Sequence, residues 1–345
     1  MNRLKILKKI SGIVLFFAAM LIACNKDVEK YPDVFVVGCE YDRQASAMIV
    51  KLWKNGEAQN LSGGESKTAN AHSVYISGND VYVAGYINIV PKLWKNGIEQ
   101  NLTGVNVYGG QAHSVFVSGS DVYVAGIEGG SFAKLWKNGL VQTIPTMVVN
   151  SYSSVFVSKN DVYLAGDNLL KNGVMQNLSR DENATHVHTN SVFVVGNDVY
   201  VAGCEIRFRD GQYYHCASLW KNGVAQYLTE ESTEQVAANS VFVSGKDVYV
   251  AGNDYVNYTN IYGTHSVSVA KLWKNGVAQN LTNGQESGFN AWANSVFVSG
   301  SDVYVAGQED SGALREFVAT LWKNGVAQNL TDGSSYASAT CVFVK

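Results

Sequence analysis

The decapeptide LWKNGVAQNL occupies residues 272–281 and recurs letter for letter at residues 321–330, with weaker copies at five other places. Its Asn-Gly pair is a strong short-range hairpin signal, because a type I′ turn requires positive φ at both central residues. The apolar and β-branched letters on either side are typical of strands. The decapeptide therefore predicts a hairpin with strands around KLW and VAQNL, formed seven times along the chain.

Two more phrases alternate with the decapeptide in a fixed order, and each also occurs seven times in close variants. The phrase SVFVSG begins at Ser73, Ser114, Ser154, Ser191, Ser240, Ser295 and, as CVFV, at Cys341. The phrase DVYVAG begins at Asp33, Asp80, Asp121, Asp161, Asp198, Asp247 and Asp302. Successive aspartates therefore stand 37 to 55 residues apart, within the range of propeller-type repeats.

Each repeat predicts four strands, which we name A (SVFV), B (DVYV), C (KLW) and D (VAQNL) in chain order. Tight turns such as SGND separate A from B, and no stretch longer than a turn has helical periodicity. Seven such units predict an all-β fold, a seven-bladed β-propeller of four-stranded antiparallel blades. A β-solenoid is the alternative, but its repeats are shorter and lack this hairpin pattern.

The ends of the repeat region predict how the ring closes. The region begins with a B strand at Asp33 and ends with an A strand over residues 341–344. The last strand can only complete the first blade, which would remove the open edges that favour aggregation. The stretch SGNDVYVAGY, residues 77–86, resembles the repeat of secreted bacterial β-propellers. That resemblance supports the fold and carries over no functional residues.

The N-terminal stretch 1–23 predicts an export signal. A basic start precedes the apolar run 10–23, which is too short to span a bilayer comfortably. The letters LIAC ending at Cys24 resemble the lipobox of bacterial lipoproteins, which implies cleavage before Cys24 and a membrane anchor on its sulfur. A plain signal peptide is the alternative. We therefore expect a signal peptide over 1–23, a tether over 24–32 and the propeller over 33–345, in an outer membrane lipoprotein on the cell surface or the periplasmic face.

Charge and motifs exclude several function classes. Removing residues 1–23 takes away four positive charges and no acids, so the formal charge changes from −3 to −7, which argues against a nucleic-acid partner. Neither G-x-S-x-G, H-E-x-x-H nor a glycine-rich phosphate loop occurs, and we expect no cofactor or metal. We expect each DVYVAG aspartate to bond its own turn backbone and each decapeptide lysine to be a solubilising charge.

The alternation of strand direction predicts two unlike faces. The A–B and C–D turns share one face, which we call the fixed face because these turns are short and nearly constant. The B–C and D–A connections share the other, which we call the variable face. Its B–C connections hold 13, 7, 8, 2, 15, 19 and 13 residues in blades one to seven, numbered from Asp33. Because loops carry recognition on a rigid scaffold, we expect a protein or glycan to bind on the variable face.

Aromatic and arginine residues gather in the long connections of blades five and six and just beyond them. Such residues are common in recognition surfaces. The expected binding residues are Arg207, Phe208, Arg209, Tyr213, Tyr214, His215, Tyr255, Tyr258, Tyr262, Phe289 and Trp292. The alternative is that these connections pack on one another and bury their own rings.

A ring of polar residues is predicted at the mouth of the central channel, one directly before each A strand. Its members, which we call the collar, are His72, His113, Ser153, Asn190, Asn239, Asn294 and Thr340. The collar could bind a small ligand or ion. It could equally satisfy backbone groups where the inner strands begin, and its near-equivalence in all blades favours that structural role.

Four cysteines follow Cys24, and export permits disulfides. If residues 209–211 form a three-residue turn, Cys204 faces Cys216 across a hairpin, which predicts a disulfide. Cys39 and Cys341 belong to the same predicted blade, where our register places them diagonally. A bond between them would lock the ring.

The function favoured by these patterns is a non-enzymatic envelope lipoprotein that binds a protein or glycan or serves as a scaffold. The alternative is a glycan hydrolase or lyase at the channel mouth, which is fold-level analogy alone. An enzyme requires carboxylates that converge from several blades. The candidates are Glu40, Asp42, Glu128, Glu205, Asp210, Asp254, Glu309 and Asp310.

Overall fold

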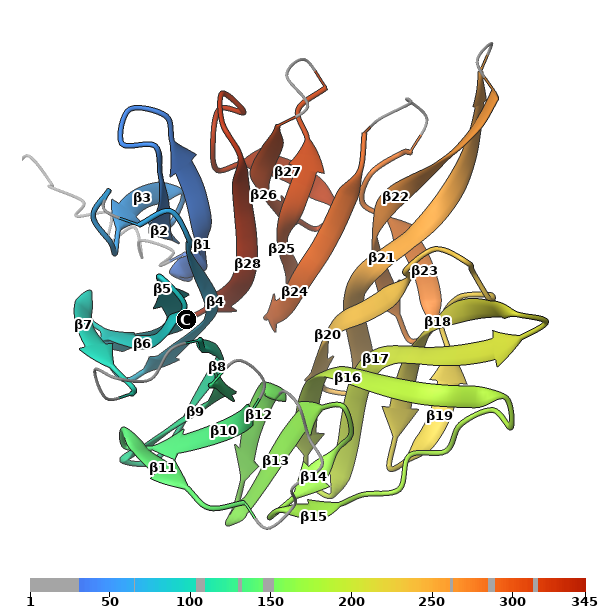
Figure 1. Ribbon diagram of the computed structural model, residues 1–345, viewed down its shortest axis with the longest axis horizontal. Helices are drawn as coiled ribbons and strands as arrows, with labels where there is room; N and C mark the ends of the chain where they lie inside the picture. The colour runs from blue at the N-terminus through green and yellow to red at the C-terminus, as the bar shows by residue number, and fades with distance from the viewer. Residues whose placement is uncertain are drawn as a thin grey trace, which may run out of the picture. The chain divides into compact units, whose positions relative to one another are not determined.

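The computed structural model describes residues 31–64, 66–103, 109–129, 132–144, 152–260, 263–284, 289–312 and 316–345, without the side chains of Tyr258 and Asn260. The chain divides into two units, Met1–Tyr31 and Pro32–Lys345. The signal peptide and Cys24 lie outside the described residues. Within the second unit the strands form seven four-stranded antiparallel sheets around a common centre, which confirms the predicted propeller (Figure 1).

Each blade contains one strand of each predicted kind, in the order A, B, C, D from the centre outward. The A strands, from blade one to blade seven, are β28 (Ala337–Val344), β4 (Ala69–Ser77), β8 (Gln111–Ser118), β12 (Tyr152–Ser158), β16 (Ala184–Val195), β20 (Ala237–Ser244) and β24 (Ala291–Ser299). The B strands are β1 (Val34–Asp42), β5 (Asp80–Ile87), β9 (Asp121–Glu128), β13 (Asp161–Gly166), β17 (Asp198–Arg209), β21 (Asp247–Asn260) and β25 (Asp302–Asp310).

The outer half of each blade is the decapeptide hairpin. The C strands are β2 (Ala47–Lys54), β6 (Val90–Lys95), β10 (Phe132–Lys137), β14 (Leu170–Lys171), β18 (Gln212–Lys221), β22 (Gly263–Lys274) and β26 (Phe317–Lys323). The D strands are β3 (Glu57–Asn60), β7 (Ile98–Asn101), β11 (Leu140–Gln142), β15 (Val174–Met175), β19 (Val224–Tyr227), β23 (Val277–Asn280) and β27 (Val326–Asn329). In all seven hairpins the Asn of Asn-Gly has φ of 49–53°, as a type I′ turn requires.

The ring closes as the sequence predicts. Strand β28 pairs with β1, and Val34 lies opposite Val344. Asp33 and Lys345 exchange two backbone hydrogen bonds of 2.9 Å beyond the last pair. The first blade is therefore built from both ends of the propeller, and every A strand has a B strand beside it.

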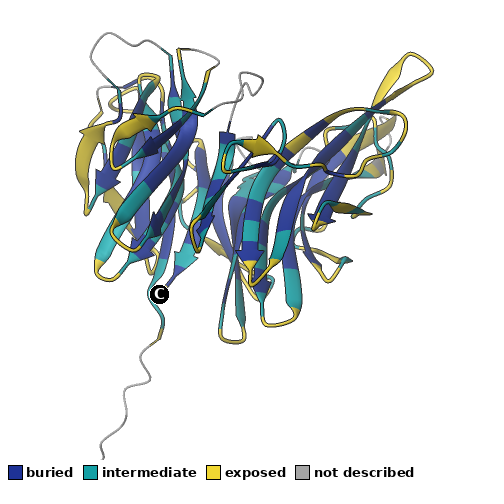
Figure 2. Ribbon diagram, turned by 90° about the horizontal axis from the view of Figure 1, so that it is seen from below, coloured by how far each residue is buried: buried dark blue, intermediate teal, exposed yellow. Residues whose placement is uncertain are grey.

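The tryptophan of the decapeptide fills the space between blades. All six of these tryptophans have no exposed surface, and Leu170 takes the same buried place in blade four. Each apolar cluster joins two neighbouring blades; Trp94 of blade two, for example, packs with Val37 and Val50 of blade one. Figure 2 shows the buried residues along the strands and the exposed ones at the turns. The constant decapeptide thus builds the scaffold.

The fixed face is held by a contact between the first residue of DVYVAG and the C–D turn, which repeats in all seven blades. In blade two, the Asp80 carboxylate lies 2.8 Å from Lys95 Nζ and accepts a hydrogen bond of 2.8 Å from Asn96 Nδ2. Asn96 Oδ1 accepts a hydrogen bond from the Val81 backbone N–H. The expectation that each aspartate bonds its own turn backbone missed this contact, in which the carboxylate binds the lysine and asparagine of the other phrase. The lysine side chains stay 35–53% exposed, as expected of solubilising charges.

Every A strand contains a β-bulge at the collar residue. In blade two the register shifts between Ala71 and Ser73, so His72 is the extra residue. The bulge lays the backbone of the A strand over the glycine of DVYVAG. A Cβ on Gly85 would lie 2.1 Å from the Asn70 carbonyl oxygen, and Gly38, Gly126, Gly203, Gly252 and Gly307 show the same approach at 1.8–2.1 Å. The glycine is required because only a hydrogen atom fits there.

The long connections of the variable face in blades five and six are extended hairpins and not irregular loops. Strands β17 and β18 run on as a paired ladder to a two-residue turn at Asp210 and Gly211, and β21 pairs with β22 up to Asn260. Apolar and polar residues alternate along these segments, as is typical of strands. The backbone hydrogen bonds are satisfied by pairing within each hairpin. The prediction of long loops on this face was wrong for these two blades.

Neither predicted disulfide forms, and all four cysteines are free thiols. The two-residue turn at 210–211 places Cys204 opposite Ala217 and Cys216 opposite Glu205. The two cysteines therefore project from opposite faces of the sheet, because side chains alternate along a strand. The three-residue turn assumed from the sequence was the error.

Cys39 lies opposite Ser338, and Cys341 lies opposite Val37. Cys341 also occupies the position that serine holds in the other six A strands. Each of those serines accepts a hydrogen bond from the backbone N–H of the next blade, such as Ser73 Oγ from Val115 at 3.1 Å and Ser295 Oγ from Val342 at 3.2 Å. Cys341 thus belongs to a ring of contacts between blades.

We expect Gly252→Ala to lower the free energy of unfolding by about 1–3 kcal/mol, because the added methyl group meets the Ala237 carbonyl oxygen at 2.1 Å. Urea unfolding followed by tryptophan fluorescence measures the change. Gly63→Ala is the matched control, since no atom lies within 4 Å of its added Cβ. Equal stability of the two variants would contradict the role of the bulge.

We expect Asp247→Asn to destabilise the protein at pH 7 and to have little effect at acidic pH. Hydrogen bonds from Asn275 and Lys274 hold the pKa of Asp247 below its ordinary value of 3.8. A lowered carboxyl pKa gives stability that is present above pH 3.8 and is lost as the pH falls through the folded-state value. Thermal unfolding from pH 7 to pH 2.5 should show the gap to wild type closing; a gap independent of pH would refute this.

Candidate functional site

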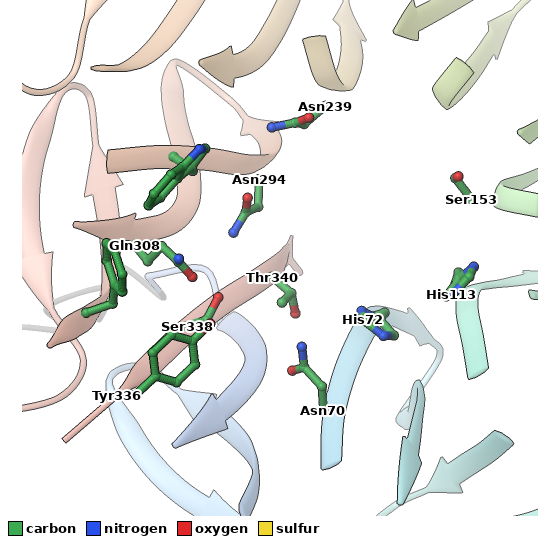
Figure 3. Close-up of a pocket in the computed structure, with 12 residues that line it drawn as sticks. Asn70, His72, His113, Ser153, Asn239, Asn294, Gln308, Tyr336, Ser338 and Thr340 are labelled. Atoms are coloured by element: carbon green, nitrogen blue, oxygen red, sulfur yellow. The ribbon is translucent and has the colours of Figure 1, made fainter. Parts of the chain in front are cut away.

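The collar surrounds the centre of the variable face, as predicted. The bulges turn these side chains toward the central opening, where Figure 3 shows most of them around a shared space. Several bind the bulge carbonyl of the next blade: Asn239 Nδ2 donates to Ala293 O at 3.0 Å, and Asn294 Nδ2 donates to Ala339 O at 2.9 Å. Asn190, Thr340 and His113 make the same kind of bond. The collar therefore has the structural role that the sequence favoured.

The collar also lines a cavity of about 650 Å³, which we call the central pocket. This volume lies within the range of small-molecule sites. Its lining residues are Asn70, His72, His113, Ser153, Asn239, Trp292, Asn294, Gln308, Phe317, Tyr336, Ser338 and Thr340. All twelve are neutral polar or aromatic residues, and no Asp, Glu, Lys or Arg is among the described residues of the lining. The pocket therefore offers hydrogen bonds and apolar surface without a counter-ion.

A closed ring of aromatic side chains surrounds the channel below the pocket, on the fixed-face side. Its members are Tyr75, Phe116, Phe156, Phe193, Phe242, Phe297 and Phe343, which we call the aromatic floor. Neighbouring centroids lie 4.6–5.2 Å apart, and Tyr75 meets Phe343 to complete the circle. Each member stands three residues beyond a collar residue on its A strand.

One wall of the pocket differs from the rest, because blades seven and one contribute an aromatic group. Trp292 lies opposite Gln308 in the register of β24 and β25, so both project from the same face of blade seven. The Trp292 ring contacts Phe317 at 5.2 Å between centroids, and Phe317 contacts Tyr336 of blade one at 6.0 Å. We call Trp292, Phe317 and Tyr336 the aromatic wall. Figure 3 shows Tyr336 and Gln308 beside Ser338 and Thr340.

The adjoining wall, from blades two and three, is uncharged. The His72 ring stacks on Tyr86 at 5.5 Å and meets the edge of His113 at 5.3 Å. Burial, reinforced by His113, lowers the pKa of His72 to about 3, although nearby Gln111 acts in the opposite direction. Burial also lowers the pKa of His113. Both imidazoles are therefore neutral at physiological pH.

The carboxylates proposed for catalysis lie outside the central pocket. Glu40, Glu128, Asp254 and Glu205 pair with Lys51, Lys134, Lys271 and Arg207 respectively, at 2.7–3.4 Å. Glu309 and Asp310 line a separate cavity of about 160 Å³ between blades six and seven. They are neighbours on β25, so they project to opposite faces, and Asp310 accepts a hydrogen bond from the Gly312 N–H. The structure does not bring these two together as an acid–base pair.

The binding residues predicted on blade five are mostly engaged with one another. Arg207 is 9% exposed, and its guanidinium binds Glu205 at 2.7 Å and Glu231 at 2.5 Å. Arg209 also binds Glu231 and lies over the Tyr214 ring. Phe208 and Tyr213 are 44% and 55% exposed, and their rings contact each other at a tilt of 52° with 4.8 Å between centroids.

The other predicted binding residues are scattered. Tyr255 packs partly buried against the core between blades five and six, and His215 lies 3.8 Å from Cys204 Sγ. Phe289 lines the small cavity of Glu309. Tyr262 and the Tyr258 side chain lie outside the described residues. Among the described members of this aromatic and arginine set, only Trp292 lines the central pocket.

Sequence reasoning missed the rest of the aromatic wall, Asn70 and Gln308, although a signal existed. The position two residues before each collar residue reads Ser338, Asn70, Gln111, Ser151, His188, Ala237 and Trp292 from blade one to blade seven. This position varies between phrases that barely vary. A variable letter at the mouth of the inner strands is the pattern of a ligand-facing position on a repeated scaffold.

Two further features bear on function. In the described ranges, no group of three or more His, Cys, Asp or Glu residues is arranged to hold a metal ion. No helix among the residues placed by the structure is long and apolar enough to cross a bilayer.

Comparison with known proteins gives remote structural similarity. No family model and no curated protein sequence matches this chain. The computationally designed Ika8 protein is similar with a TM-score of 0.44 and 15% identity, covering 89% of this chain and 90% of its own. An extracellular domain assigned to a one-component system of B. thetaiotaomicron gives a TM-score of 0.36 and 11% identity, covering 83% of this chain and 52% of that one. Similarities at this level say nothing about function.

We expect His72 to stay neutral from pH 8 to pH 4.5, because burial lowers its pKa to about 3. The unfolded chain binds this proton near pH 6.5, so His72 should reduce stability as the pH falls below 6.5. NMR of the histidine rings tests this, with His72→Gln to assign the signal. A titration midpoint of the His72 ring near pH 6.5 would contradict the burial of this imidazole.

Proposed function

We propose that this protein is a non-enzymatic envelope protein that binds a glycan in the central pocket. The observation that carries the proposal is the composition of the lining, in which amides, hydroxyls and neutral imidazoles stand beside the aromatic wall. Sugars present hydroxyl groups at their edges and apolar C–H groups on their faces. The amides and hydroxyls of the pocket can donate hydrogen bonds to the sugar hydroxyls and accept hydrogen bonds from them. An aromatic ring can pack on the apolar C–H face of the sugar.

The absence of charge in the described lining distinguishes a glycan from other ligands. A phosphate, carboxylate or ammonium group would lose its water in this pocket without gaining a partner of opposite charge, which costs several kcal/mol. An uncharged, hydroxyl-rich ligand avoids this cost. The collar is fixed by its bonds to neighbouring blades, so little side-chain entropy remains to be lost on binding.

The lipid anchor and the location in the outer membrane belong to the same proposal. They rest on the export signal and the LIAC motif at the N-terminus. A polar tether between Cys24 and the first blade would leave the propeller free of the membrane surface. Whether the pocket faces the medium or the periplasm decides between extracellular and cell-wall glycans, and protease accessibility in intact cells distinguishes them.

A glycan array followed by calorimetry tests the proposal, with Trp292→Ala as the key variant. We expect binding to at least one glycan. Removal of the Trp292 ring should lower the affinity at least tenfold, which corresponds to about 1.4 kcal/mol. Trp292→Phe should recover part of the affinity because it keeps an aromatic face.

Phe208→Ala discriminates this proposal from binding at the blade-five hairpin, because Phe208 is exposed and far along that hairpin. Wild-type affinity in Phe208→Ala together with loss in Trp292→Ala supports the central pocket. The reverse pattern, or release of shorter sugars from the glycan, would overturn the proposal in favour of the hairpin or of an enzyme.

A further inference from the structure

We infer that the central pocket receives the end of an uncharged glycan chain, with hydroxyl groups of the terminal sugar bound by Asn70 and His72. This inference rests on the function proposed above and adds the part of the glycan that is recognised. Three independent observations carry it: a blind end, two unpartnered polar atoms and a one-sided aromatic wall.

The aromatic floor makes the pocket a dead end for a sugar. Seven centroids spaced 4.6–5.2 Å apart in a closed circle lie about 5–6 Å from its centre. The rings themselves, with contact distances of about 3.5–4 Å between carbon atoms, fill most of that radius. The ring of aromatic side chains therefore narrows the channel, and we infer that a sugar chain does not thread through it but enters from the variable face by one end.

Two buried polar atoms at the pocket have no hydrogen-bond partner. They are Asn70 Oδ1 and His72 Nε2, both on β4. A buried polar atom without a partner costs about 1–3 kcal/mol. Ten side-chain atoms of the described residues are in this state, and these two are the ones whose residues line the central pocket. Asn70 Oδ1 can accept a hydrogen bond from a hydroxyl, and His72 Nε2 can donate or accept according to its tautomer. A hydroxyl suits both atoms, whereas a carboxylate, which only accepts, could bind His72 Nε2 but not Asn70 Oδ1.

His72 stands out among the collar residues, because most of them make a bond that its Nε2 atom does not make. Five collar residues bind the bulge carbonyl of the next blade, as Thr340 binds Ala71 O and His113 binds Tyr152 O. His72 Nε2 makes no such bond. Tyr86 stacks on the ring and lies opposite Asn70 in the register of β4 and β5, so it holds this part of the pocket in place.

The aromatic wall lies close to these atoms on one side of the pocket. Figure 3 shows Thr340 next to Asn70 and His72, with Tyr336 on the other side of Thr340, whereas Asn239 lies across the opening. A terminal sugar stacked on the aromatic wall would therefore present its edge to blade two. The aromatic and unpartnered groups together select one orientation of one sugar, which a sevenfold ring of equal residues could not do.

Binding to oligosaccharides of different length, and so with different numbers of chain ends per unit mass, tests the inference without any protein variant. The probes are the neutral glycan identified by the array, at lengths of two to eight sugar units, and its parent polymer. We expect the molar affinity to stop rising once the chain exceeds the pocket, and the polymer to saturate at one protein per chain. A bulky fluorophore on one terminus should weaken binding more than a hundredfold, and on the other less than threefold.

Binding that scales with the mass of polymer, or equal affinity for both end-labelled forms, would overturn chain-end recognition while leaving glycan binding intact. A failure of every neutral glycan to bind would instead overturn the proposed function. The two failures are thus distinguishable.

Variants test the two atoms. Asn70→Ala and His72→Gln should each weaken binding about tenfold without a change in the unfolding midpoint. Asn280→Ala, which removes the same groups from the exposed strand β23, is the matched control and should bind as wild type. Wild-type affinity in both pocket variants would overturn the assignment. If Asn70→Ala is destabilised, the end-labelling result still decides the matter.

Discussion

The β-bulge at the start of each inner strand is the constraint on which the rest of the structure depends. The extra residue shifts the register by one and turns a polar side chain toward the centre. The same shift lays a backbone carbonyl over the neighbouring B strand, at a distance that leaves room only for glycine. The collar, the constancy of the AG letters and the central pocket all follow from this one local irregularity.

The repetition and the departures from it have different roles. Asp–Lys–Asn contacts on the fixed face, buried tryptophans between blades and serine bonds between inner strands recur around the ring. Nearest-neighbour contacts of this kind stabilise a repeat protein and carry no information about a ligand. The departures that line the central pocket lie in blades seven, one and two: Trp292 and Asn70 occupy equivalent positions, and Tyr336 stands two residues before the corresponding Ser338. These unlike residues on one side of the pocket allow a nearly symmetric ring to bind a single ligand in one orientation.

Much of the fold could be predicted from the sequence because its signals are local. Asn-Gly turns, period-two strands and the phrase order define seven blades and their closure. The position of the collar was also predicted, since strand direction decides which residues meet at the channel mouth. The disulfide between Cys204 and Cys216 failed on a single residue of turn length, which reverses the face of every following side chain. The pairing register of a hairpin is therefore hard to predict from sequence, because it depends on the turn length to a single residue.

The candidate site was less predictable, because it depends on which side chains meet across blades. The sequence predicts Arg207 as a recognition residue, but its guanidinium donates a hydrogen bond to Glu231, which lies 24 positions away in the sequence. Phe317 and Tyr336 read as parts of connections, yet they meet Trp292 from two blades. The aromatic floor was visible as the third letter of each SVFV phrase, but its closure into a ring needs the geometry of all seven blades.

The most direct test of this account is a crystal structure with a bound neutral oligosaccharide that the array identifies. We expect the terminal sugar in the central pocket, stacked on Trp292, with hydroxyls at a normal hydrogen-bond distance from Asn70 and His72. The rest of the chain should leave through the variable face. Density on the blade-five or blade-six hairpin, with the central pocket filled by water alone, would contradict it.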